Sequence, residues 1–322
     1  MEFLTDSVNS MLIRFIKRSI AVMLVAMIAA ILLPGRPGLA KDPAVYDSAE
    51  AAAQAILDAL AKADRNAILA VLGDKFADEL FTDEESRERD SYKRIVAGAK
   101  EVMQLRADDD NTRVMVIGKD AWPMPIPIVK TDAGWAFDTA AGIDEMLARL
   151  IGKNELATID TLRAFVEAQT QYASTDRDGD EVLEYAQKVI STEGKKDGLY
   201  WQVASADEDD SPFGPFIAEL PDYVHDRTKG EPYMGYYYRI ITRQGDNPPG
   251  GRYDYIINGN MIAGFAAIAV PAEYAETGVM TFIISHQGKL YEKDLGDDTA
   301  LVAAAMQDYN PDETWTVVKD EE

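Results

Sequence analysis

The sequence predicts an α+β protein, with N-terminal helices on a curved antiparallel sheet, then bridging helices and a C-terminal antiparallel β-meander with a covering helix. Apolar residues recur at helical spacing in residues 46–105 and 140–172, whereas residues 235–318 contain short β-branched and aromatic runs between turn sequences. Hydrophobic residues make up 47% of the chain, which is enough to build the core of a globular protein.

The first forty residues have the pattern of a secretory signal peptide. Three basic residues precede an uninterrupted apolar run at residues 20–33, and the small residues Gly38 and Ala40 stand just before Lys41. The run is shorter than the roughly 20 residues that a membrane-spanning helix needs. We therefore expect residues 1–40 to be removed, leaving a periplasmic or secreted protein without a stable membrane anchor.

The first predicted domain, residues 41–152, contains helices followed by strands. Helical spacing of apolar residues predicts helices at residues 46–62, 66–72 and 84–105. β-branched residues predict a strand at 112–117, and a turn before a Gly-Trp pair predicts that a hairpin closes at 131–138. This order of elements resembles the cone-shaped fold of nuclear-transport-factor-2-like domains. That resemblance implies a curved sheet but no particular activity, since the fold has many functions.

Prolines give the segment 122–129 a special pattern. Pro123, Pro125 and Pro127 stand at alternate positions. Alternate amides of a strand point to the same edge, so three prolines in this register remove three donors from one edge. The pattern predicts a strand at the edge of its sheet.

The second predicted domain, residues 153–322, begins near Gly152. Helices at 140–151 and 155–172 are expected to bridge the two domains, and another helix is predicted at 181–190. The strands of the meander are predicted at residues 235–242, 251–257, 261–270, 279–285, 289–293 and 314–318. The helix that covers the meander is predicted at residues 298–306.

Three stretches, residues 122–127, 232–240 and 269–284, resemble an uncharacterised bacterial exported family, domain of unknown function 2950. The resemblance extends over nearly all of the chain after the signal segment. It implies an exported two-part protein with no assigned activity and no catalytic residues to transfer. The C-terminal meander is also loosely similar to pilin heads, although here the signal leads into a separate N-terminal domain.

Composition excludes several classes of function. The net charge of −24 repels phosphate backbones and anionic lipid headgroups, so neither nucleic acid nor a membrane surface is an expected partner. The absence of cysteine excludes a thiol nucleophile, a thiolate metal site and a lipid-modified cysteine. With two histidines, one chain cannot form a three-histidine zinc site.

The acidic turn at residues 176–184 is the sharpest local motif. Asp176, Asp178 and Asp180 alternate around Gly179, and Glu184 follows at the ninth position, as in loops that bind calcium. The sixth position, usually glycine, is Glu181, which departs from that pattern. The alternative is a turn whose carboxylates cap a helix beginning at Glu181. We treat both interpretations as open at this point.

Tyrosines suggest a second candidate site in the C-terminal domain. Aromatic faces beside carboxylates suit sugar rings, so five tyrosines are candidates for a glycan-binding face: Tyr233, Tyr236, Tyr238, Tyr253 and Tyr255. The alternative is that tyrosines at alternate strand positions pack within the sheet, as β-forming residues commonly do.

Catalytic activity has weaker support in the sequence than binding does. Glu273 and Glu276 are candidates for paired catalytic carboxylates, and Ser285 with His286 is the only adjacent serine–histidine pair, on a turn unsuited to direct contact. We therefore expect an exported, non-enzymatic protein that binds an envelope protein or glycan, with no cofactor unless the acidic turn holds a structural calcium ion. The rival hypothesis is a cell-wall glycan hydrolase or modifying enzyme that uses paired carboxylates.

Overall fold

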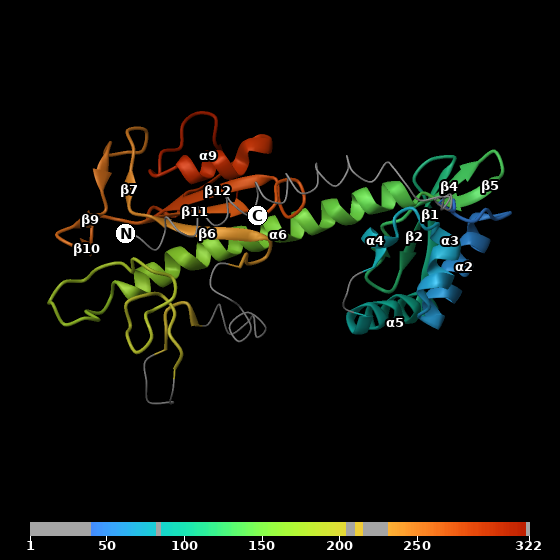
Figure 1. Cartoon of the computed structure of the whole chain (residues 1–322), viewed down its shortest axis with the longest axis horizontal. Coiled ribbons are helices and arrows are strands. Elements are labelled where there is room, and N and C mark those ends of the chain that lie inside the picture. Colours follow the sequence, from blue (N-terminus) through green and yellow to red (C-terminus); the bar gives the residue numbers. More distant parts are fainter. Residues whose placement is uncertain (1–39, 82–84, 204–209, 215–230, 320–322) are drawn as a thin grey trace, which may run out of the picture. The chain divides into compact units, whose positions relative to one another are not determined.

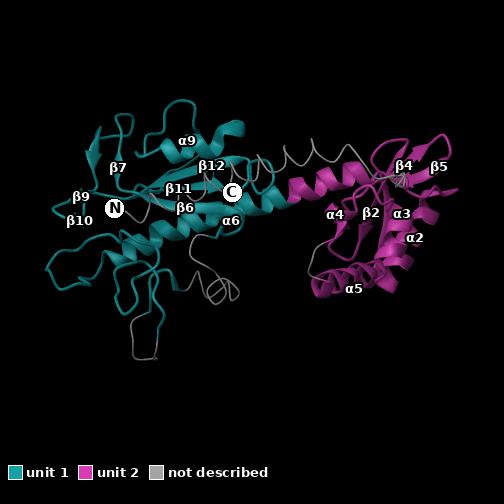
Figure 2. Ribbon diagram, viewed as in Figure 1, with its two compact units in different colours: residues 1–28, 150–322 teal, residues 29–149 magenta. Residues whose placement is uncertain are grey.

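The computed structural model describes residues 40–81, 85–203, 210–214 and 231–319. Nearly all of the predicted signal segment lies outside these residues. The chain forms two compact units that divide between Arg149 and Leu150 (Figure 2), here named the N-terminal and C-terminal units. The fold class is α+β, as the sequence predicts.

Helices come first in the N-terminal unit (Figure 1): α2 (Ala49–Lys62), α3 (Arg65–Leu72), α4 (Ala77–Leu80) and α5 (Glu85–Glu101). The side chains of Ser48 and Asp64 cap α2 and α3 by accepting hydrogen bonds from backbone amides of the first turn. The alanine-rich face of α2 is buried in the core, as its spacing predicts. The first two predicted helices are confirmed.

An antiparallel sheet follows, built from β1 (Met103–Ala107), β2 (Thr112–Ile117), β3 (Trp122–Pro123), β4 (Ile128–Thr131) and β5 (Gly134–Phe137). Its order is β1-β2-β4-β5, with β3 paired to β2. The predicted helix at 84–105 is wrong in its last turn, because α5 ends at Glu101 and residues 103–107 pair with β2. Met103 and Leu105 alternate toward the core there, which is the spacing of a strand.

The proline-rich segment forms no continuous edge strand. It splits into β3 and β4, and β4 lies between β2 and β5 in the interior of the sheet. Because prolines supply no amide donors, regular pairing stops after Pro123 and resumes at Ile128, beyond Pro127. The edge-strand prediction is therefore wrong for β4, while the predicted hairpin of β4 and β5 is confirmed.

One helix, α6 (Thr139–Tyr172), replaces the two predicted bridging helices. Gly152 lies within it, and glycine in a helix interior costs only about 1 kcal/mol, which the long flanking segments tolerate. Residues 139–149 of α6 belong to the N-terminal unit and residues 150–172 to the C-terminal unit. Within the described part of the chain, no helix is both long and apolar enough to cross a membrane.

The predicted helix at residues 181–190 is wrong. Its backbone amides serve other segments: that of Tyr185 donates to the Met261 carbonyl, and that of Ala186 to the side chain of Gln169. Glu181 adopts a left-handed φ of 67°, which is incompatible with starting a helix. Long-range hydrogen bonds therefore hold this segment in a non-helical form.

The main C-terminal sheet is an antiparallel meander, as predicted, but it has five strands and not the six expected. Its order is β14-β13-β12-β11-β6, and the strands are β6 (Tyr236–Ile241), β11 (Ala266–Pro271), β12 (Met280–Ser285), β13 (Leu290–Asp294) and β14 (Thr316–Val317). Two short strand pairs interrupt the chain between β6 and β11: β7 (Arg243–Gln244) with β8 (Tyr253–Asp254), and β9 (Ile256–Ile257) with β10 (Asn260–Met261). The predicted strand at 251–257 is wrong, because its residues pair in these two short hairpins outside the main sheet, and the predicted strand at 261–270 is continuous only from Ala266.

Helices cover both faces of this sheet (Figure 1). On one face, Tyr238 shares a hydrogen bond with Thr158 of α6, with 3.0 Å between the hydroxyl oxygens. On the other, Arg239 donates to the carbonyls of Ala303 and Met306, at 3.2 and 2.5 Å, at the end of α9 (Thr299–Ala305), which follows the 3-10 helix η1 (Gly296–Asp298). The predicted covering helix is confirmed, and the sheet is an interior layer.

Candidate functional site

The acidic turn follows the C-terminal end of α6. Asp176 Oδ1 accepts a hydrogen bond from the Gly179 amide at 2.8 Å, and Oδ2 accepts one from the Glu181 amide at 3.0 Å. These backbone donors hold the pKa of Asp176 below its usual value. The left-handed backbone of Glu181 closes the turn around this carboxylate, so a glutamate occupies the conformation for which calcium loops usually use glycine.

Three carboxylates converge at the turn. One oxygen each of Asp176, Asp178 and Asp180 lies within 4.8 Å of the others; Asp176 is half-buried and the other two are exposed. Carboxylate oxygens are the preferred ligands of hard cations, and calcium takes six to eight oxygens at about 2.3–2.6 Å. The turn could therefore supply three ligands, with backbone carbonyls or water completing the shell.

Glu184 is not part of this convergence. Its Oε2 accepts a hydrogen bond from the Met261 amide at 3.1 Å, and burial followed by the charges of Asp178 and Asp180 raises its pKa. Asp180 Oδ2 accepts from the side-chain amide of Asn260 at 2.8 Å. The turn is thus tied to β10, and no local pattern in the sequence predicts this connection.

The helix-capping alternative for the acidic turn is wrong, since no helix begins at Glu181. Asp180 Oδ1 accepts from the Val182 amide at 2.8 Å, which closes a local turn instead. The carboxylates of Asp176 and Asp180 therefore satisfy turn amides.

The five candidate tyrosines do not form a continuous exposed face. Tyr236 and Tyr255 are fully buried, Tyr233 is buried, and Tyr238 and Tyr253 are half-buried. The Tyr236 hydroxyl donates to the Met280 carbonyl at 2.9 Å, and that of Tyr255 donates to Gln244 Oε1 at 3.1 Å. Burial raises the pKa of both phenols. These side chains pack in the core, in line with the alternative interpretation.

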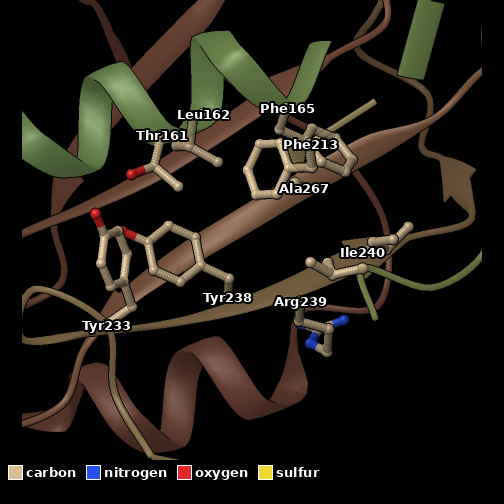
Figure 3. A pocket seen from close by; sticks show the side chains of 10 residues that line it. Thr161, Leu162, Phe165, Phe213, Tyr233, Tyr238, Arg239, Ile240 and Ala267 are labelled. Atoms are coloured by element: carbon tan, nitrogen blue, oxygen red, sulfur yellow. The ribbon is translucent and has the colours of Figure 1, made fainter. Parts of the chain in front are cut away.

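A small cavity of ≈ 60 Å³ lies between α6 and β6 (Figure 3). Tyr233, Tyr238 and Leu162 line it together with other apolar groups, while the side chain of Arg239 points away from it (Figure 3). No carboxylate is among its lining residues. A volume of this size admits only a few water-sized molecules, so it does not suit a sugar ring.

The loop from β11 to β12 places Glu273 and Glu276 together in solvent. The hydrogen bond that protonated Glu276 donates to Glu273, then partial burial, raises the pKa of Glu276. Neither residue lines the small cavity or the larger one of ≈ 360 Å³ in the N-terminal unit, which Lys41 and Gly73 help to line. The two carboxylates are thus close to each other and outside both of these cavities.

The same loop is fastened to α6 by residues that sequence reasoning missed. Asn154 Nδ2 donates to the Thr277 carbonyl at 2.9 Å, and Glu155 Oε1 accepts from the amides of Val279 and Met280, each at 2.9 Å. The only sequence clue is a polar pair next to the apolar stripe of a predicted helix. These contacts are structural, since they satisfy backbone groups at the start of β12.

Ser285 and His286 lie at the end of β12. The Gly288 amide donates to the Ser285 carbonyl, so His286 stands in a turn, as predicted. Its ring lies edge-on to Tyr255 and Phe265, and burial lowers its pKa. His286 Nδ1 is buried without a hydrogen-bond partner among the described residues. The geometry gives no nucleophile–base contact between the two side chains.

A comparison with protein families settles the affiliation of the chain. The profile described as "Protein of unknown function (DUF2950)" matches residues 43–318. The chain belongs to this family. No curated protein and no solved structure gave a match to this DUF2950 protein. Family membership confirms the resemblance seen in the sequence and assigns no activity, so the function has to be argued from the geometry above.

Proposed function

We propose that this DUF2950 protein is exported to the periplasm or secreted, and acts there as a non-enzymatic binding or envelope-interaction protein whose C-terminal unit holds a structural calcium ion. The observation that carries the calcium assignment is the convergence of Asp176, Asp178 and Asp180 within 4.8 Å. The N-terminal charge and hydropathy pattern supports export. The acidic composition is compatible with cations and basic partners.

The ion would act by joining two segments. Asp180 and Glu184 already contact Asn260 and Met261, and the side-chain amide of Gln187 donates to the Gly259 carbonyl at 2.7 Å. Without a cation, the clustered carboxylates repel each other at neutral pH. A bound cation would remove that repulsion and fix the turn against the hairpin of β9 and β10.

The neighbouring surface is suited to a partner. Leu183, Ile257 and Ile262 are 58%, 45% and 42% exposed, on the same two segments that the turn connects. Exposed aliphatic side chains rimmed by acidic groups fit an envelope protein with apolar and basic groups better than a glycan. Three of the five candidate tyrosines, Tyr233, Tyr236 and Tyr255, are buried and so offer no face to a sugar ring.

Thermal melts of residues 41–322 in EDTA and in 10 mM calcium test the proposal. At a dissociation constant of about 10⁻⁴–10⁻³ M, calcium should raise the Tm by roughly 3–10 °C. Asp178→Ala should abolish the rise, whereas Asp110→Ala, in an acidic run that does not converge, should leave it intact. An equal Tm in both buffers would reject the calcium site.

A further inference from the structure

The segment that follows the predicted cleavage site is anchored by its first residue. The backbone amide of Lys41 donates to Asp74 Oδ1 at 2.6 Å, and the Lys41 carbonyl accepts from the Asp74 amide at 3.1 Å. Lys41 is the first of the described residues to make a hydrogen bond; Ala40 is exposed and makes none. The residue at which the mature chain is expected to begin is thus held by two hydrogen bonds to Asp74.

The receiving surface is shaped for this segment. Gly73, at the end of α3, has a left-handed φ of 79°, and a Cβ there would lie 2.6 Å from the Lys41 carbonyl oxygen and 3.0 Å from the Pro43 nitrogen. A glycine is therefore required for the chain to pass this closely. The Ala44 amide donates to the Val71 carbonyl at 3.1 Å and continues the attachment.

We propose that Asp74 is a capture site for the new amino terminus that signal cleavage creates at Lys41. Hydrolysis of the Ala40–Lys41 amide by water leaves a carboxylate on Ala40 and an amine on Lys41, which takes up a proton. The neutral amide donor at 2.6 Å from Asp74 Oδ1 then becomes an ammonium group, and the hydrogen bond becomes an ion pair. Cleavage thereby strengthens the attachment of the first residues to α3.

Other charged groups lie near the hydrogen bond between Lys41 and Asp74. Lys75, the next residue after Asp74, places its ammonium group 4.9 Å from the centre of the Phe76 ring. Four ionisable residues help to line the larger cavity beside this segment: Lys41, Asp42, Lys75 and Asp138. Asp74 is the carboxylate to which the Lys41 amide donates.

The inference rests on the proposed export, and the first measurement separates the two. The full chain is expressed with a C-terminal tag, and the intact mass and N-terminal sequence of the protein outside the cytoplasm are determined. Absence of any processed form would overturn export and this inference together. A processed form that begins at a residue other than Lys41 would overturn only the inference.

The second measurement compares the chain beginning at Lys41 with one that retains Ala40, each released from a carrier that leaves no extra residue. The Lys41 form should melt about 2–5 °C higher at low salt, with slower hydrogen exchange at the Asp74 amide. Asp74→Asn and 1 M NaCl should each remove the difference, whereas Asp78→Asn, on the exposed side of α4, should preserve it. Equal melting and exchange of the two forms would overturn the capture site.

Discussion

Two glycines of α6 provide a matched test of how this helix is packed. Gly142 and Gly152 both lie inside α6. A Cβ at Gly142 would lie 2.5, 2.8 and 2.9 Å from the Cγ1, Cβ and Cα atoms of Ile126, whereas a Cβ at Gly152 would have no heavy atom within 4 Å. The same substitution, glycine to alanine, therefore meets a packed core at one position and solvent at the other.

The expected signs are opposite. Alanine in place of a helical glycine gains up to about 1 kcal/mol in both cases. At Gly152 nothing offsets this gain, so Gly152→Ala should stabilise the protein by about 0.5–1 kcal/mol. At Gly142 the overlap includes a backbone atom, which cannot move aside as a side chain can, and overpacking typically costs about 1–3 kcal/mol. Gly142→Ala should therefore destabilise it by up to about 2 kcal/mol.

Urea unfolding of residues 41–322, followed by circular dichroism and tryptophan fluorescence, measures both effects. The midpoints should shift in opposite directions with unchanged m-values. A destabilised Gly152→Ala variant would refute the continuous helix through this position. A Gly142→Ala variant at least as stable as the wild type would refute the packing of α6 against Ile126.

Three further predictions concern single side chains. Arg239→Met should lower the free energy of unfolding by about 1.5–3 kcal/mol, because it removes the guanidinium group that donates to the carbonyls at the end of α9. Arg243→Met, at an exposed ion pair, should lower it by less than about 1 kcal/mol, and urea titration of the two variants compares these losses. The pKa of His286 is lowered by burial, so the folded state favours the neutral ring and stability should fall as pH drops below about 6.5. Thermal melts at pH 5–8 should show a smaller loss of Tm in His286→Asn than in the wild type. Curves of Tm against pH that run parallel for the two proteins would contradict this. The pKa of Glu276 is raised by Glu273, so its ionisation opposes folding as pH rises. Glu276→Gln should therefore raise the Tm slightly at pH 8 and not at pH 4, and the reverse order would contradict the raised pKa of Glu276.

Local sequence patterns were sufficient to predict an element where a helix and a strand would need different spacings of apolar residues. The alanine-rich face of α2, the turn sequences of the C-terminal meander and the hairpin of β4 and β5 all have patterns that fit one kind of element. The segment around Met103 and Leu105 failed because these residues fit both a helix end and a short strand. Only pairing with β2 decides between the two.

Other errors came from partners distant in the sequence. The fate of residues 181–190 depends on Gln169 and Met261, which take amides that a helix would use internally. The burial of Tyr236 depends on α6 covering its face of the sheet, while α9 covers the opposite face. An alternating strand pattern alone cannot indicate whether one or both faces are covered.

The candidate metal centre was partly visible in the sequence. Alternation of Asp176, Asp178 and Asp180 around a glycine indicated convergence, and their oxygens do lie together. The role of Glu184 was not predictable, because its partner is the amide of Met261 on a separate strand. Likewise, Glu155 carries no motif, since its acceptor role depends on the position of the loop before β12.

The most direct test of the calcium site is a calcium titration of residues 41–322 followed by NMR at the amides of Gly179 and Glu181, which donate to Asp176. The account predicts saturable shifts at these amides and at Met261, with one ion bound per chain and no response in Asp178→Ala. Amide positions that stay unchanged up to 10 mM calcium, or that shift equally in Asp178→Ala, would contradict it.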